Sequence, residues 1–211
     1  MAHPVLHPNA LTKLETVKRF LGTNTAVPDD VLIRLINQAS AYVEQALGRK
    51  LGRAVYTEQL KGNGNQYLLL SNYPIVAVEH VKQAGDMLDP SLWDYEQGAL
   101  SGVLYKDTGW TFYGFPHGLA GDPITGSRNI EVRYTAGYIL PKDGTRARPA
   151  DLPADIEGLV LDMIQHIAGK MQSGGNAGLK SFAISDVRWE WQTESPPSWQ
   201  AIIDGHKRYW I

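Results

Sequence analysis

The sequence predicts an α+β protein: a helical bundle of two N-terminal helices and one long later helix, with an antiparallel β insertion between them. Apolar residues recur at spacings of three and four in two long segments about a hundred residues apart, as in amphipathic helices. Between these segments the pattern changes to alternation, which is typical of half-buried strands. An extended aromatic C-terminal tail is expected to follow the last long helix.

The composition indicates an ordinary globular protein. Of 211 residues, 43% are hydrophobic and 20% are charged, and the net charge is −2, so no overall basic field attracts nucleic acid. The chain has no cysteine, which excludes disulfides, thiolate metal ligands and cysteine nucleophiles. No apolar run approaches the ~20 residues that span a bilayer, and the N-terminus lacks the features of a signal peptide. We therefore expect a soluble protein that is made and used in a cytoplasm.

Residues 1–10 are expected to form a flexible arm, because they contain two prolines and no apolar periodicity. His3 and His7 have a spacing that can hold a metal ion on a helix. Pro4 and Pro8 argue against a helix here, so no metal site is expected.

The clearest helix is expected over residues 28–50. Pro28 suits the first helical position, the acidic residues that follow it suit the helix dipole, and Gly48 offers a stop. A shorter helix is expected over residues 11–21, where Thr12 and Glu15 match the spacing of a capping box. Together these two helices are expected to form a helical hairpin whose apolar faces pack against each other.

The period changes to two from Arg53 onward. The turn residues 62–65, Gly-Asn-Gly-Asn, favour a hairpin between strands at 53–61 and 66–70. No Lys-Ser/Thr and no helix follow these glycines, which argues against a phosphate-binding loop. Further strands are expected at 75–83, 92–96, 102–106 and 129–134.

Residues 107–127 form a long segment rich in glycine, proline and aromatic residues. Its aromatic residues either cap the local β core or contact a partner; they are Trp110, Phe112, Tyr113 and Phe115. A loop further on, within 141–149, carries the basic residues Lys142, Arg146 and Arg148, which either face DNA or form an ordinary solvated loop.

A second long helix is expected from about residue 152 to 172. Its first residues include a proline followed by an acid, as at the start of the helix expected over 28–50. After a Ser/Gly linker, the tail carries aromatic residues that either anchor a partner or fold back onto the chain's own domain. These candidate anchors are Trp189, Trp191, Trp199, Tyr209 and Trp210. The expected domains are an arm at 1–10, a helical core at 11–52 and 150–173, an inserted β domain at 53–149, and a tail at 174–211 with a short terminal helix.

Candidate catalytic groups are sparse. Asp94 with Glu96, or Asp162 with His166 on a helix, are the acid–base candidates, and none of these pairs has a further partner near it in the sequence. We therefore expect no enzyme activity, no cofactor and no metal. An alternative is a carbohydrate- or protein-binding module that uses the aromatic segment at 110–122, with Asp122 as a polar contact for a sugar.

Several segments in a fixed order resemble one protein family. They are LTKLETVKRFLG, PDDVLIRLINQASAYVEQALGRKL, SNYPIVAVEHV, NIEVRYTAGY and DLPADIEGLVLDMIQHIAGK. Within residues 11–172 this order resembles the head–tail connector (adaptor) proteins of tailed bacteriophages. The long β section and the aromatic segment at 107–127 depart from the short members of that family.

The resemblance implies a virion neck protein without catalytic activity, assembled in the host bacterial cytoplasm. It implies a homo-oligomeric ring of about twelve copies beneath the portal protein, closed by heterologous contacts. The ring would extend the channel for double-stranded DNA without reading its sequence, and would dock the next neck or tail-completion protein. The tail after Gly175 lies outside these motifs, so its binding to the portal is a hypothesis that rests on its tryptophans.

Overall fold

The computed structural model describes residues 4–22, 27–111, 128–173 and 196–208. The chain divides into two compact units. The helical unit comprises residues 1–52 and 138–211, and the β unit comprises residues 53–137. Helices lie in the first unit and antiparallel sheets in the second, so the predicted α+β class is confirmed.

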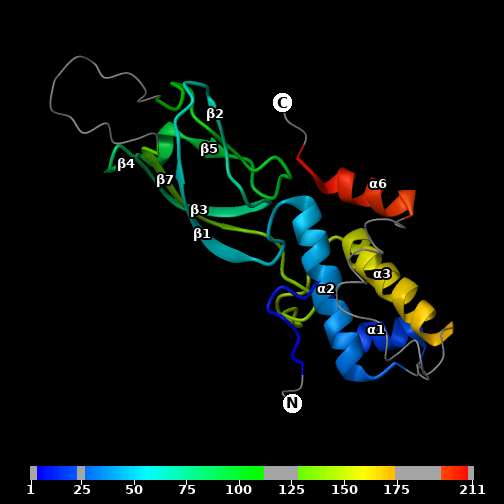
Figure 1. The fold of residues 1–211 in the computed structure, drawn as a ribbon. Helices are drawn as coiled ribbons and strands as arrows, with labels where there is room; N and C mark the ends of the chain where they lie inside the picture. Colours follow the sequence, from blue (N-terminus) through cyan, green and yellow to red (C-terminus); the bar gives the residue numbers. More distant parts are fainter. Residues whose placement is uncertain (1–3, 23–26, 112–127, 174–195, 209–211) are drawn as a thin grey trace. The chain divides into compact units, whose positions relative to one another are not determined.

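The helical unit contains four described helices (Figure 1). The long helices α2 and α3 lie side by side, and α1 and α6 pack at opposite ends of this pair (Figure 1). A two-helix hairpin completed by one later helix was expected, whereas a fourth helix also packs here. The bounds are α1 Leu14–Leu21, α2 Asp29–Leu47, α3 Ala154–Ser173 and α6 Pro197–His206.

The apolar stripes of α2 and α3 form the core of this unit. Their buried residues recur at the spacings that define one helix face, and they include Leu32, Ile36 and Val43 of α2 and Leu159, Met163 and Ile167 of α3. Gly48 ends α2 in the left-handed conformation with φ 69°, and its N–H donates to Gln45 O. Glycine suits this position because a side chain would be strained there.

The predicted capping box before α1 is wrong. Lys13 occupies the N-cap position and makes no side-chain cap hydrogen bond. The Thr12 hydroxyl is buried and donates instead to Glu157 Oε1 of α3 at 2.8 Å. A tertiary contact therefore replaces the local contact that the sequence favoured.

The β unit is built from two antiparallel sheets. The first has the strand order β1-β7-β3-β4 and the second the order β2-β6-β5, with the short 3-10 helix η1 (Pro90–Leu92) in the same unit. The strands of the first sheet are β1 Ala54–Leu60, β7 Ile130–Ala136, β3 Ile75–Gln83 and β4 Asp86–Met87. Those of the second are β2 Tyr67–Leu69, β6 Val103–Tyr105 and β5 Asp94–Tyr95.

The predicted hairpin around the Gly-Asn-Gly-Asn turn is also wrong. The strands on either side of this turn are β1 and β2, and they belong to different sheets: β1 pairs with β7, and β2 pairs with β6. The turn packs against Trp110, because Gly64 N donates to Trp110 O at 2.8 Å and Trp110 N donates to Asn65 O at 2.8 Å. At Gly62 an added Cβ would lie 1.9 Å from Thr111 O, so only glycine fits this approach.

The inserted unit ends at Gly137 and not at 149 as predicted. Tyr138 N donates to Leu51 O at 2.7 Å, and the side chain of Leu140 is buried in the helical core. The chain therefore returns to the helical unit directly after β7. The loop at 141–149 belongs to that unit.

The prediction of an extended tail is wrong for the part of the tail that is described. Helix α6 packs against α2 and α3, and its Trp199 and Ile203 are buried in the helical core. An amphipathic segment with two large apolar side chains covers the exposed core of a thin bundle, which favours this docking. The remainder of the tail, 174–195 and 209–211, lies outside the described residues.

Candidate interaction surfaces

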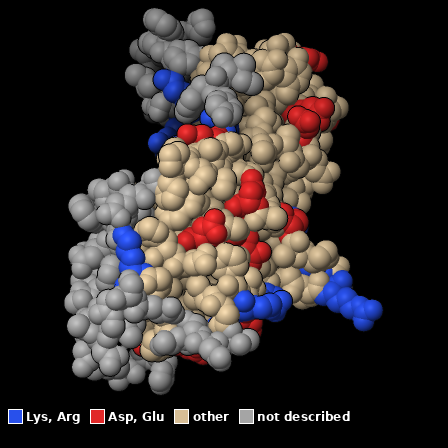
Figure 2. Space-filling view, turned by 90° about the vertical axis from the view of Figure 1, so that its right-hand side faces the viewer, with Lys and Arg blue, Asp and Glu red and all other residues tan. Residues whose placement is uncertain are grey.

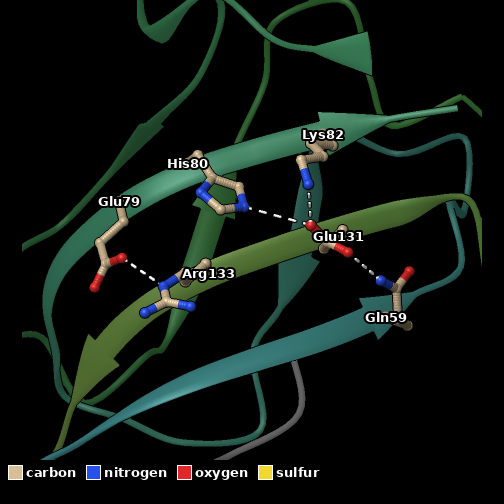
Figure 3. A network of polar contacts seen from close by, with 6 residues as sticks. All are labelled: Gln59, Glu79, His80, Lys82, Glu131 and Arg133. Carbon is tan, nitrogen blue, oxygen red and sulfur yellow. Dashed lines mark hydrogen bonds and ion pairs between the residues drawn. The ribbon is translucent and has the colours of Figure 1, made fainter. Parts of the chain in front are cut away.

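The outer face of the first sheet carries a network of charged and polar side chains (Figure 3). Strand β7 alternates buried residues with outward residues, and the outward set includes Glu131 and Arg133. Glu131 accepts from Lys82 Nζ at 2.7 Å, lies 3.4 Å from His80 Nε2, and accepts from Gln59 Nε2 at 2.6 Å. One carboxylate on the central strand therefore joins β1, β7 and β3.

A second ion pair lies on the same face. Arg133 Nε donates to Glu79 Oε2 at 2.6 Å, and both side chains are more than one-third exposed. Register shifts in β3 lie between Ile75 and Ala77 and between Val78 and His80, and they bring Glu79 and His80 to this face next to each other (Figure 3). The sequence pattern gave no signal for this arrangement, since it depends on a bulge.

Hydrogen bonding holds the pKa of Glu131 below its ordinary value. The largest cause is the bond from Lys82, followed by the bond from His80, while partial desolvation acts in the opposite direction. The carboxylate is therefore ionised and paired across the neutral range. Such a surface can mate with a polar partner, but its paired charges offer no free acid or base.

A polar stripe on α2 holds the N-terminal arm. Asn37 accepts from His7 N at 2.8 Å and donates to Val5 O at 2.9 Å, and the Ser40 hydroxyl accepts from Leu11 N at 3.0 Å. Ala10 is fully buried. The arm that the sequence predicted as flexible at 1–10 is therefore fixed along α2 over its described part.

Glu44 anchors the far end of this stripe. Its carboxylate is 3% exposed and accepts from Asn9 Nδ2 at 3.1 Å, Lys50 Nζ at 2.8 Å and Leu51 N at 3.0 Å. The hollow between the arm and α2 has a volume of about 110 Å³, well below the size of typical ligand pockets. This polar cluster therefore serves the fold.

The structure places the acid–base candidates Asp94, Asp162 and His166 among its described residues. Asp94 Oδ1 accepts from its neighbour's N–H, Tyr95 N. His166 packs its ring edge against Trp199 with centroids 5.8 Å apart, and Asp162 on the same helix is exposed. Within the described parts of the chain, no group of three or more acidic or histidine residues could hold a metal ion. His7 is described and His3 lies outside the described residues.

Trp110 belongs to the core of the β unit. Its side chain is fully buried, and its Nε1 donates to Gln66 O at 3.0 Å and to Leu104 O at 3.3 Å. Of the two alternatives for this aromatic segment, the structure places Trp110 in the core-capping role. The other members, Phe112, Tyr113 and Phe115, lie outside the described residues, as does Asp122 of the sugar-binding alternative.

Trp199 is likewise buried, at 6% exposure, against the helical core. At the end of α6 the ring of His206 meets Asp155 Oδ2 at 2.7 Å, and Arg49 donates to His206 O at 3.3 Å. This tryptophan therefore contacts its own unit, which is the alternative that the sequence left open. Trp189, Trp191, Tyr209 and Trp210 lie outside the described residues.

The basic loop at 141–149 presents two of its three cations to solvent. Arg146 and Arg148 are exposed, whereas Lys142 is 21% exposed and donates to Asp143 at 2.7 Å. Thr145 Oγ1 accepts from Arg148 N at 3.1 Å, which fixes the loop backbone. On the face drawn in Figure 2, lysines and arginines form separate small groups among acidic and uncharged residues.

The described elements carry polar surfaces with paired charges, and comparison with known proteins gives the class of the protein. A family model described as "Head completion protein" matches residues 10–167, about three quarters of the chain. The chain therefore belongs to the head completion protein family, a family of structural phage proteins. The predicted resemblance to phage head–tail connector proteins is confirmed, and so is a structural role at the phage head–tail junction.

One solved structure supports the fold. A chain of a structure titled "Virion of native gene transfer agent (GTA) particle" matches with a TM-score of 0.55 at 15% identity, covering 100% of this chain and 96% of that one. Likeness at this identity shows the fold alone. No curated protein matches the chain. Among the described helices, none has the length and apolar character to cross a membrane.

Proposed function

We propose that this protein forms a ring on the portal protein, extends the DNA channel, and joins the DNA-filled head to the tail. The observation that carries the proposal is the family match over residues 10–167, which includes α1, α2, the β unit and most of α3. The ring has about twelve copies and is closed by heterologous contacts, in which two different surfaces of each copy meet. It assembles in the host bacterial cytoplasm and becomes part of the virion neck.

The outer face of the β unit's first sheet suits one side of such a contact. Its network of Glu131, Lys82 and Arg133 is ordered by cross-strand bonds before any partner arrives. An ordered polar surface loses little side-chain entropy when it docks. Neighbouring copies, or the next neck or tail-completion protein, would meet this face.

The loop with Arg146 and Arg148 is the proposed DNA-facing element. Exposed guanidinium groups attract phosphate without reading bases, which suits DNA that slides through a channel. Because the net charge of the protein is −2, the rest of the chain attracts DNA only weakly. Lys142 is a weaker candidate because Asp143 already neutralises it.

The proposed partner contacts, with the portal protein as the partner of the tail, are aromatic residues outside the described part of the chain. Trp110 and Trp199 are excluded from this set because both are buried within their own units. The set comprises Trp189, Trp191, Tyr209 and Trp210 of the tail and Phe112, Tyr113 and Phe115 of the aromatic segment. Tryptophan and tyrosine are favoured anchors where two proteins bury a surface.

Electron cryomicroscopy of the protein mixed with purified portal protein tests the proposal. We expect a ring coaxial with the portal, with its copy number set by the portal symmetry and the loop at 141–149 lining the channel. Monomers scattered on the portal, or a ring with this loop on its outer wall, would contradict the proposal.

A double substitution separates the DNA role from assembly. Arg146→Glu with Arg148→Glu should leave ring formation unchanged and lower the infectivity of virions that carry it, because like charges repel DNA in the channel. Arg19→Glu with Arg34→Glu is the matched control, since it changes two exposed arginines outside the loop. Normal infectivity of the double variant would exclude the loop from the channel.

A further inference from the structure

The second sheet of the β unit carries a pair of tyrosine side chains on its outer side. Leu68 and Leu104 lie opposite each other and are both buried, so their neighbours along the two strands point to the other side of the sheet. On that side Tyr67 lies opposite Tyr105, and their ring centroids are 5.5 Å apart. Tyr67 is 57% exposed, so the pair offers an accessible aromatic surface.

Hydrogen bonds hold this tyrosine pair in place. The Tyr105 hydroxyl donates to Asp107 Oδ1 at 2.8 Å, which fixes the direction of that ring. The backbone on both sides is also fixed, because Tyr67 O accepts from Asn63 Nδ2 at 2.9 Å and Asp107 O accepts from Gln66 Nε2 at 2.9 Å. A surface that is ordered in advance loses little side-chain entropy when a partner binds.

The charges beside the tyrosine pair are negative. Asp94 of β5 lies in the same cross-strand row as the two rings, and both Asp94 and Asp107 are exposed. Residues 83–127 contain six acidic residues but only one lysine or arginine, which is Lys106. Lys106 is 8% exposed, and its Nζ donates to Gln83 Oε1 at 2.9 Å inside the unit. The accessible charges in the described part of this segment are therefore carboxylates.

We propose that this surface binds a basic, arginine-bearing segment of a partner protein. The surface is called the acidic aromatic face and consists of Tyr67, Tyr105, Asp94 and Asp107. A guanidinium group stacks on aromatic rings, and its N–H groups match the geometry of a carboxylate. The face offers both kinds of contact within one cross-strand row, so a single arginine can use a ring and a carboxylate together.

The charge of the acidic aromatic face also determines which partners it disfavours. Carboxylates repel phosphate groups, so this face does not bind DNA. A lysine is a less suitable ligand than an arginine, because its ammonium group is compact, strongly hydrated and unable to stack. In the ring of the proposed function, the face would lie away from the DNA channel. That consequence rests on the proposed function, whereas binding of a basic segment does not and needs no portal protein for its test.

Fluorescence anisotropy with two labelled peptides of equal length, oligoarginine and oligolysine, tests the proposal on the full-length protein at physiological salt. The oligoarginine peptide should bind about fivefold more tightly, because only a guanidinium stacks on the rings. Tyr67→Ala should remove this preference, whereas Tyr67→Phe keeps the ring and should retain it. Asp94→Asn with Asp107→Asn should weaken the binding of both peptides and reduce its salt dependence.

Glu15→Gln with Asp30→Asn is the matched control for the acidic pair, since it removes the same charge from exposed residues of the helical unit. This control should bind both peptides as the wild type does, and circular dichroism should show that every variant is folded. Equal affinity of the wild type for the two peptides, or equal weakening in the control and in the Asp94 and Asp107 variant, would overturn the proposal. Saturable binding of a neutral oligosaccharide that is lost in Tyr67→Ala would overturn it too, by assigning the face to a sugar.

Discussion

The helical unit and the β unit differ in how far other segments of the chain cover their helices and strands. In the helical unit, segments from both ends of the chain cover the helices: the arm lies along the polar stripe of α2, and α6 lies on α2 and α3. In the β unit, the core is filled by Trp110 and its neighbours, and among the described residues strand β1 has a strand neighbour, β7, on one side only.

This difference indicates where a partner can bind without displacing a segment of the same chain. A partner on the helical unit must compete with segments that already bind there, whereas no described strand has to move before a partner meets the outer side of β1. Terminal segments that dock on a core open more readily than the core itself, which places α6 and the arm among the parts that can change on assembly.

Replacing Trp110 should destabilise the β unit most. Trp110→Ala removes a fully buried ring and two side-chain hydrogen bonds, so the free energy of unfolding should fall by about 3–5 kcal/mol. Urea denaturation measures the loss. The control Tyr67→Ala, at a residue 57% exposed in the same unit, should cost far less. Similar losses in both variants would contradict the assignment of Trp110 to the core.

Replacing Trp199 should release α6 and leave the β unit intact. Trp199→Ala removes the main apolar contact of a short helix at the edge of the bundle, with a loss of about 3 kcal/mol in docking. Hydrogen exchange should speed up across Pro197–His206 and stay unchanged in β7. Equal protection of α6 in the variant and the wild type would mean that other contacts hold it.

Replacing Glu44 should loosen the arm. Glu44→Gln keeps an amide oxygen for Leu51 N but sets an NH2 group against the donors Asn9 Nδ2 and Lys50 Nζ, at a cost of about 1–2 kcal/mol. Thermal unfolding measures the loss. Asp30→Asn, an exposed acid on the same helix, is the control and should change the unfolding temperature little. A neutral result for Glu44→Gln would indicate that water readily replaces these bonds.

The smallest effect is expected at Glu131 and depends on pH. Its pKa is lowered in the folded protein, so its pairing stabilises the fold above the ordinary pKa of a glutamate and is lost as the pH falls through the lower, folded-state value. Glu131→Gln should therefore flatten the loss of stability between neutral and acidic pH. An identical acid profile for the variant and the wild type would show that the exposed network contributes nothing measurable.

The sequence predicted the long helices well because helix signals are local. The expected segment at 28–50 became Asp29–Leu47, and its apolar stripe is the buried face. Strand partners were not predictable in the same way. Alternation identifies β1 as a strand, but its partner β7 lies far along the chain and nothing local favours it over the nearby β2.

Most of the candidate surfaces are formed by residues that lie far apart in the sequence, so the sequence did not predict them. The network around Glu131 needs three strands in register and a bulge in β3, and the binding of the arm needs Asn37 and Ser40 to meet backbone groups about 30 residues away. Hydrogen bonds of this kind leave no periodic signal. The family resemblance was visible because it rests on the order of whole segments.

The measurement that tests the central claim most directly is the mass in solution by light scattering, with and without purified portal protein. The chain has a mass of 23.3 kDa. The account predicts that adding portal protein gives one closed complex, heavier than the portal by about a dozen copies, whatever the state of the free protein. A free protein whose mass does not change with portal protein present would contradict the role as a ring-forming connector.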